Sequence, residues 1–207
     1  MTFYFLDGEW ECEPYPMVDR FWPGPYRAHY DSGTGIGLSE AISRVLKFAN
    51  ANGPFDGIMG FSQGAALTAA VLARMHKIDA SNSFFKFGIL MCGGRPTEVG
   101  SNARWPSKRF YRPPRNSLSL STSRLNEKTQ LVTSHPSPKI RIPTAHFAGI
   151  RDPLYEETLA LYSTADQESA LLWEFDDGHT IPRNSMATAQ MAAIIRKTAR
   201  RASEDRE

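Results

Sequence analysis

"FDGIMGFSQGAALTAAVLARM", residues 55–75, joins two patterns of different period at one turn. A short apolar run of strand length ends at Phe61, and small apolar residues with helical spacing continue after Ser62. The pentapeptide Gly-Phe-Ser-Gln-Gly, residues 60–64, stands at the join. A strand followed by a sharp turn and a helix is the unit of which parallel sheets covered by helices are built.

The rest of the chain repeats this alternation. Apolar runs of strand length lie at 3–6, 57–61, 87–92, 142–148 and 170–175. Helical patterns lie at 38–49, 66–74, 154–165 and 184–195, the last with Asn184 as its N-cap. We therefore predict an α/β fold, with a mostly parallel sheet of about five strands and helices on both faces. At 207 residues, we expect a single domain.

One segment departs from this pattern in composition and charge. The chain has a net charge of +2, yet residues 101–141 hold nine Lys and Arg against one acidic residue, Glu127. The segment is rich in Ser and Pro, so residues 101–139 are predicted to form a basic low-complexity insertion or disordered loop. Nucleic acid or an anionic membrane surface would attract these charges. Because Trp105, Phe110 and Tyr111 are too few for a regular stacking platform, no nucleic-acid partner is expected.

Several other classes of protein or site are not supported. The chain has no apolar run long enough to span a membrane and no signal-peptide pattern at its start, which predicts a soluble, cytoplasmic protein. Cys12 and Cys92 lack the spacing of a disulfide framework, a zinc cluster or a redox pair, and are interpreted as ordinary thiols. The glycines of 31–40 do not match a dinucleotide-binding loop, because Leu38 occupies the third glycine position. A flexible helix entrance is the better interpretation.

Ser62 has the surroundings of a nucleophile. G-x-S-x-G between a strand and a helix holds the serine oxygen above the sheet on a tight turn. The backbone N–H of Gln63 then points to where an oxyanion would form, at the positive end of the helix. The alternative is a Ser-Gln helix cap flanked by glycines.

A nucleophilic serine needs a histidine to accept its proton. The chain has five histidines, and His179 is the best candidate because it follows the last predicted strand, where a parallel sheet presents its sites. His146 lies inside a predicted strand and is expected to be a core imidazole. The others are His29, His76 and His135, upstream of the serine, on the following helix and in the basic segment.

The histidine in turn needs a carboxylate to orient it. Asp152 follows the predicted strand 142–148 and gives the order serine, aspartate, histidine that an α/β-hydrolase shows. Asp176 and Asp177 are closer in sequence to the histidine, but they would more easily cap their own loop. Glu156 and Glu157 are interpreted as charges at a helix start.

These motifs resemble those of the FSH-type serine hydrolases of the α/β-hydrolase superfamily. The resemblance lies in "FYFLDGEWECEPYP" with "PGPYRAHYD", in "FDGIMGFSQGAALTAAVLA", in "IRIPTAHFAGIRDPLYEE" and in "WEFDDGHTIPR". It implies Ser62 as nucleophile, Asp152 as acid and His179 as base. It also implies hydrolysis of carboxylic esters or thioesters without metal or organic cofactor. Some members of the family release polyketide acyl chains from a carrier domain, so a carrier-bound acyl chain is an expected substrate beside small esters.

The chain departs from the family pattern at its start. Family members open with a strand and a Leu-His-Gly-like turn that supplies a second oxyanion donor, whereas this chain opens with what resembles the following strand, 3–6. The sequence therefore predicts an N-terminally truncated sheet and weak hydrolysis. Either 3–6 pairs directly with 57–61, or both keep unpaired backbone groups. The alternative function is a weak or inactive hydrolase-like protein that binds an acyl ligand or a partner.

Overall fold

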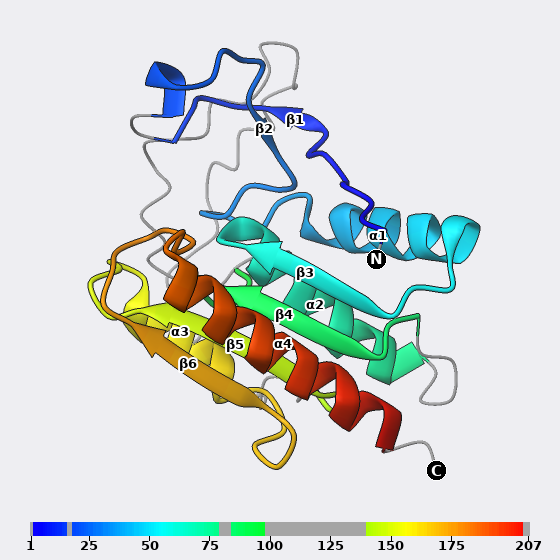
Figure 1. The fold of residues 1–207 in the computed structure, drawn as a ribbon. Coiled ribbons are helices and arrows are strands. Elements are labelled where there is room, and N and C mark those ends of the chain that lie inside the picture. Colours follow the sequence, from blue (N-terminus) through cyan, green and yellow to red (C-terminus); the bar gives the residue numbers. More distant parts are fainter. Residues whose placement is uncertain (1, 16–17, 79–83, 98–139, 205–207) are drawn as a thin grey trace, which may run out of the picture.

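The computed structural model describes residues 2–15, 18–78, 84–97 and 140–204. Its centre is a parallel sheet with the strand order β3-β4-β5-β6 (Figure 1). The strands are β3 (Gly57–Phe61), β4 (Phe87–Met91), β5 (Thr144–Gly149) and β6 (Leu171–Phe175). The predicted parallel sheet is thus confirmed, with four strands in the part that the structure describes, in place of about five.

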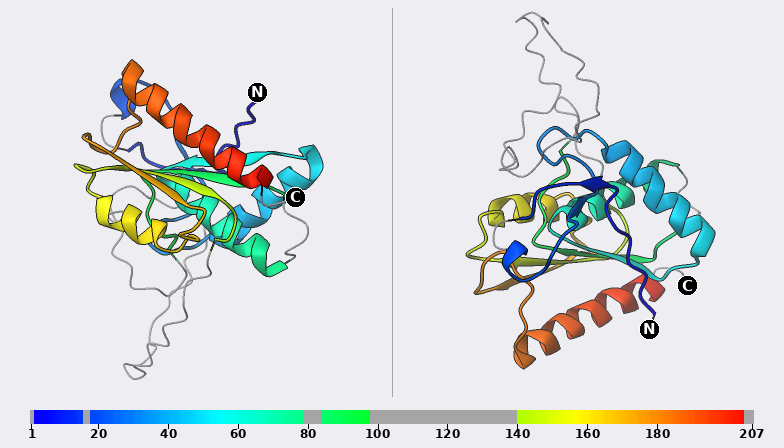
Figure 2. Two further views of the ribbon diagram at one scale, coloured as in Figure 1. Left: turned by 60° about the horizontal axis from the view of Figure 1, so that its bottom comes forward. Right: turned by 90° about the horizontal axis from the view of Figure 1, so that it is seen from above.

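Helices cover both faces of this sheet. They are α1 (Leu38–Asn52), α2 (Gln63–Ile78), α3 (Tyr155–Tyr162) and α4 (Ser185–Glu204). Figures 1 and 2 show α4 alone on one face and the other three helices on the opposite face. Asn184 caps α4 as predicted, because its side-chain oxygen accepts a 2.8 Å hydrogen bond from the backbone N–H of Ala187.

Each face of the sheet has its own apolar core, and strand β4 contributes to both. Leu90 packs into the core under α1 and α2, whereas its neighbours Ile89 and Met91 pack toward α4. This alternation follows from the two-residue period of a strand. Strand β5 is buried along its whole length, as expected for an inner strand of a covered parallel sheet.

The N-terminal segment does not form the predicted strand 3–6. Phe3, Tyr4 and Phe5 are 63%, 58% and 88% exposed, and the segment has no regular secondary structure. Apolar composition alone does not make a strand, because a strand needs a neighbour that accepts its backbone hydrogen bonds. Within the described residues, β3 is an edge strand of the sheet and pairs with β4 alone.

The remainder of the N-terminal segment crosses the carboxyl end of the sheet. It contains β1 (Trp10–Glu11) and β2 (Arg27–Ala28), which form a short antiparallel pair, and the 3-10 helix η1 (Val18–Arg20). In Figure 1 this pair lies above β3, away from the sheet. The glycine-rich stretch that follows is the entrance to α1, as predicted, with Gly37 in a left-handed conformation (φ 88°) at the helix N-cap.

The basic segment 101–139 lies outside the described residues, so its predicted character and its relation to nucleic acid stay predictions. In the part of the chain that the structure describes, none of the helices combines the length and the apolar character needed to cross a bilayer. Cys12 and Cys92 are both free thiols.

Candidate active site

Ser62 occupies the tight turn between β3 and α2. Its backbone is left-handed (φ 54°), a conformation that non-glycine residues rarely adopt and that is common at functional sites. The turn is fixed on both sides: the Ser62 N–H donates to the carbonyl of Met91 (2.9 Å), and its own carbonyl accepts from Ala65 N–H (3.0 Å). These bonds hold the serine side chain at the carboxyl end of the sheet.

The glycines around Ser62 have different roles. A Cβ atom on Gly60 would fall on the backbone of Gly64, so the turn cannot close around a larger residue. Gly64 itself has no atom within 4 Å of a Cβ built there, so the turn excludes a side chain at the first glycine of the motif and not at the second. A third glycine, Gly93 after β4, is required because a Cβ there would meet the side chain of Ala65.

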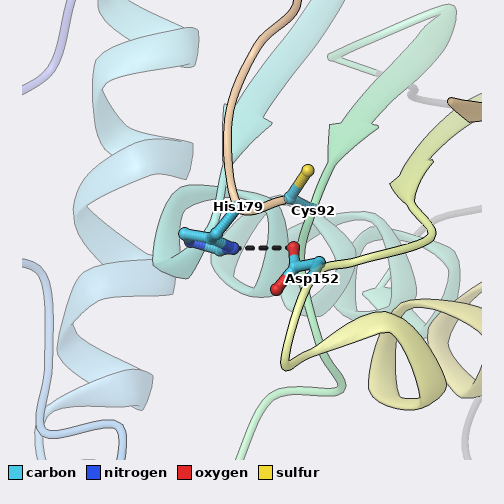
Figure 3. Close-up of side chains that lie close together, drawn as sticks. All are labelled: Cys92, Asp152 and His179. Carbon is cyan, nitrogen blue, oxygen red and sulfur yellow. Dashed lines mark hydrogen bonds and ion pairs between the residues drawn. The ribbon is translucent and has the colours of Figure 1, made fainter. Parts of the chain in front are cut away.

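His179 and Asp152 complete a chain of hydrogen bonds with the serine. The Nε2 atom of His179 lies 2.8 Å from the Oγ of Ser62, and its Nδ1 lies 2.7 Å from Oδ2 of Asp152. Figure 3 shows His179 and Asp152 facing each other across this second bond. The Asp152 side chain is 1% exposed and that of His179 is 12% exposed, so both are shielded from bulk water while the imidazole keeps some access.

The loops after β5 and β6 are packed together, which sets this geometry. Ile150 N–H donates to Phe175 O, and Arg151 N–H donates to Asp177 O (both 3.0 Å). A Cβ on Gly149 would collide with the carbonyl of Gly178, so the two loops approach this closely only with glycine there. Residues 27 positions apart in the sequence are thereby held at hydrogen-bond distance.

The Asp152 carboxylate is stabilised in its charged form. Burial alone would raise the pKa of Asp152, but hydrogen bonds from His179 and from the Leu154 N–H (2.8 Å) lower it below its usual value. An ionised acid at this position favours the His179 tautomer with its proton on Nδ1, which leaves Nε2 free to accept the serine proton.

The other candidate acids lie elsewhere. Asp177 is exposed and accepts a hydrogen bond from Gly178 N–H, capping its own loop as the sequence predicted. Asp176 forms an exposed ion pair with Arg151 (3.1 Å). At the start of α3, Glu156 is exposed and Glu157 pairs with Arg95 (3.5 Å).

The other candidate histidines are also accounted for. His146 is fully buried in β5, as predicted, and burial lowers its pKa to about 3. The ring of His29 contacts Arg44 (Nδ1 to guanidinium 3.0 Å). His135 and the side chain of His76 lie outside what the structure describes. Of the histidines that it describes, the one hydrogen-bonded to Ser62 is His179.

Comparison with known proteins identifies the family. The serine hydrolase (FSH1) family matches the chain over residues 2–191. The chain belongs to the FSH1 serine hydrolases. Esterase FPY3 of Fusarium mangiferae is 30% identical over 200 residues, which are 96% of this chain and 82% of that protein. Esterase FUS5 of Gibberella moniliformis is 27% identical over 206 residues, covering 95% of this chain and 73% of that protein.

A solved structure agrees with this assignment at the level of the fold. The monoacylglycerol lipase of Paleococcus ferrophilus superposes with a TM-score of 0.52 at 12% identity. The match covers 87% of this chain and 81% of the lipase. The FSH1 chain therefore has the α/β-hydrolase fold that its motifs predicted.

In this FSH1 chain, the side chain of Gln63 makes contacts that the motif alone did not reveal. Its backbone N–H stands at the start of α2, where the sequence places an oxyanion donor. Its side-chain amide reaches across to the N-terminal segment, accepting a hydrogen bond from His29 N–H (2.8 Å) and donating to the carbonyl of Tyr30 (2.9 Å) and to Ser32 Oγ (2.6 Å). The partners precede Gln63 by 31 to 34 residues, so no local pattern signals them.

Cys92 is the other residue of the site that sequence reasoning did not place there. It follows β4, is 1% exposed, and has a left-handed backbone (φ 49°). Its thiol lies beside the Asp152–His179 pair, within 4.8 Å of a carboxylate oxygen and a ring nitrogen (Figure 3), and 3.6 Å from Thr180 O. Burial raises the pKa of Cys92 to about 11, which keeps the thiol protonated. A protonated thiol beside an acid and a histidine already bonded to each other fits a hydrogen-bonded cluster better than a metal site.

Proposed function

We propose that the protein is a serine esterase or thioesterase that works through an acyl-enzyme intermediate, with Ser62 as nucleophile, His179 as base and Asp152 as acid. The observation that carries the proposal is the continuous hydrogen-bonded chain from Ser62 Oγ through both nitrogens of His179 to Asp152. A serine becomes nucleophilic at neutral pH when its proton has such an acceptor.

In the first half-reaction, His179 Nε2 takes the hydroxyl proton while Ser62 Oγ attacks the substrate carbonyl carbon. The carbonyl π electrons move onto oxygen, and the Gln63 N–H stabilises that oxyanion beside the positive end of α2. As the tetrahedral intermediate collapses, the bond to the leaving oxygen or sulfur breaks. The leaving group takes the proton from His179, and the acyl group remains on the serine.

In the second half-reaction, a water molecule replaces the leaving group. His179 removes one water proton as the water oxygen attacks the acyl carbon, and then returns that proton to Ser62 Oγ as the acid is released. An alcohol or amine in place of water would give acyl transfer with the same residues. The charge on Asp152 stabilises the imidazolium form of His179 in both halves.

The surroundings of His179 support an acyl substrate with an apolar part. The rings of Tyr15 and Phe61 flank the imidazole, with centroids 5.8 Å and 5.0 Å from it. The proposed substrates are small carboxylic esters and acyl thioesters, including acyl or polyketide chains on a carrier protein in secondary metabolism. The fungal relatives named esterases support the ester class. A cytoplasmic location belongs to the same proposal.

The test needs no knowledge of the natural substrate. The protein is incubated with a fluorophosphonate, and its intact mass and the labelled peptide are determined by mass spectrometry. We expect one adduct, on Ser62, and none in Ser62→Ala. Hydrolysis of p-nitrophenyl acetate and of an acyl thioester by the same preparation then compares the two leaving groups. An unlabelled wild-type protein, or a label on another serine, would contradict the proposed function.

A further inference from the structure

The amide of Gln63 is matched to three backbone and side-chain groups of a distant segment. A primary amide combines an acceptor with two donor hydrogens on one planar group. Here the acceptor receives His29 N–H, and the NH₂ group donates to Tyr30 O and Ser32 Oγ. Because a backbone N–H can only donate and a carbonyl can only accept, these partners fix the orientation of the amide.

The segment that holds this amide is itself anchored. Tyr30 is 2% exposed and Ser32 is 8% exposed, so two of the three partners of the amide are shielded from bulk water. From the other side, Thr97 Oγ1, in the loop after β4, donates to Ser32 O (2.7 Å). Residues 29–32 therefore join the N-terminal segment, the start of α2 and the loop after β4.

The Gln63 backbone N–H belongs to the first turn of α2, whose N–H groups have no acceptor within the helix. Its direction depends on the left-handed turn at Ser62 and on what holds the rest of Gln63. We propose that the Gln63 side chain is a positioning group, which aims its own N–H at the oxyanion by clamping residues 29–32 to the start of α2. This inference rests on the proposed function.

The principal test is Gln63→Ala, which keeps the backbone N–H and removes the clamp. With p-nitrophenyl acetate we expect kcat to fall about 10- to 100-fold. A small displacement of an oxyanion donor can lower kcat almost as much as removal of that donor. KM should stay within about twofold, because ground-state binding does not use the oxyanion contact. The inhibition constant of a trifluoromethyl ketone, which forms an oxyanion on Ser62, should rise by the same factor as the loss in kcat/KM.

Two further variants separate positioning from loss of structure. Ser32→Ala leaves Gln63 intact but removes one of its three partners, and should lower kcat about fivefold with KM unchanged. The matched control is Thr198→Val in α4, which removes a buried threonine hydroxyl bonded to a backbone carbonyl (Ile194 O, 3.0 Å) outside the segment that Gln63 clamps. It should keep kcat within about twofold of the wild type.

Two results would overturn the proposal. One is wild-type kcat in Gln63→Ala or, should that variant not fold, in Ser32→Ala. The other is an equal loss of kcat in Thr198→Val, with KM rising in this variant and in Gln63→Ala, which would indicate a general loss of structure. Either result is distinct from a failure of the proposed function, in which the wild-type protein is not labelled by the fluorophosphonate.

Discussion

Ser62, His179 and Asp152 are expected to act as one unit, since each hydrogen bond of the chain is useful only when the next is present. We predict that Ser62→Ala and His179→Ala each lower kcat for p-nitrophenyl acetate by about 10³-fold or more. Asp152→Asn should cost a similar factor, because an amide at this position favours the wrong histidine tautomer. Steady-state kinetics on the purified variants provide the measurement.

The matched control for the acid is Asp177→Asn. This carboxylate is exposed and bonded to its own loop, so kcat should remain within about twofold of the wild type. A larger loss in this variant than in Asp152→Asn would mean that the acid is Asp177.

The two thiols are predicted to differ in reactivity. Cys92 is 1% exposed and has a pKa of about 11, so almost none of it is a reachable thiolate at pH 8. Cys12 is partly exposed, and burial followed by the charge of Glu13 raises its pKa more modestly. Iodoacetamide should therefore alkylate Cys12 at least about tenfold faster, as measured by peptide mass spectrometry. Equal alkylation rates of the two thiols in the native protein would show that the Cys92 site opens freely. As a control, both thiols should react in urea.

Three residues of the candidate site could be predicted from the sequence, because their positions along the chain indicate their chemistry. Ser62 stands in a recognisable turn, and Asp152 and His179 each follow a strand, so the edge at which they meet was predictable. The amide clamp of Gln63 was not, because its partners are backbone groups and a serine that carry no distinctive signal. The position of Cys92 beside the acid depends on strand register, which a single sequence does not specify.

At the scale of elements, the two glycines of the turn between β3 and α2 differ in the space available for a side chain. Gly60→Ala places a methyl group on the backbone of Gly64, so we predict a loss of about 2 kcal/mol or more in the free energy of unfolding. Gly64→Ala meets no atom and lies within a helix, where alanine should stabilise by about 0.5–1 kcal/mol. Urea unfolding followed by circular dichroism measures both. A larger destabilisation by Gly64→Ala would contradict the geometry of this turn.

Elements with strong periodicity were predicted correctly. The predicted strand 3–6 was wrong, because strand formation there depends on pairing with a neighbouring strand. The four strands of the parallel sheet and α1 to α3 follow the apolar patterns to within a few residues at their ends, β5 begins two residues later than predicted, and α4 extends nine residues beyond its predicted end at 195. The run 3–6 has the composition of a strand but no pairing in the structure, because β-structure is a property of neighbouring segments rather than of one.

At the scale of the whole molecule, the fold gathers the ends of three parallel strands and the start of α2 at one edge of the sheet. The proposed chemistry is placed at this edge because the carboxyl ends of parallel strands coincide there and a helix N-terminus adds positive potential. The same architecture buries β5 completely, and with it His146, whose ring nitrogen Nε2 lies 3.0 Å from Thr144 Oγ1, while its Nδ1 has no hydrogen-bond partner among the residues that the structure describes. The ring is therefore held in its neutral form.

This burial predicts how global stability depends on pH. Burial lowers the pKa of His146 to about 3 from an ordinary value of 6.5, so between these values the unfolded chain binds a proton that the folded protein does not. The neutral ring makes its full contribution to the free energy of unfolding above pH 6.5, and this contribution is lost as the pH falls toward 3. From pH 8 to pH 5 the loss is about 2 kcal/mol, at about 1.4 kcal/mol per pH unit below 6.5.

The His146→Gln variant isolates this contribution, because glutamine still pairs with the Thr144 hydroxyl and does not titrate. The free energy of unfolding in urea is measured at pH 8 and pH 5 for both proteins. The carboxylates and the other histidines are common to the two proteins, so the difference between their pH dependences belongs to position 146. We expect the wild type to lose about 2 kcal/mol more than the variant over this interval, even if the variant is less stable at pH 8. Equal losses would mean that His146 becomes protonated inside the folded protein, and that β5 is less tightly packed than its burial indicates.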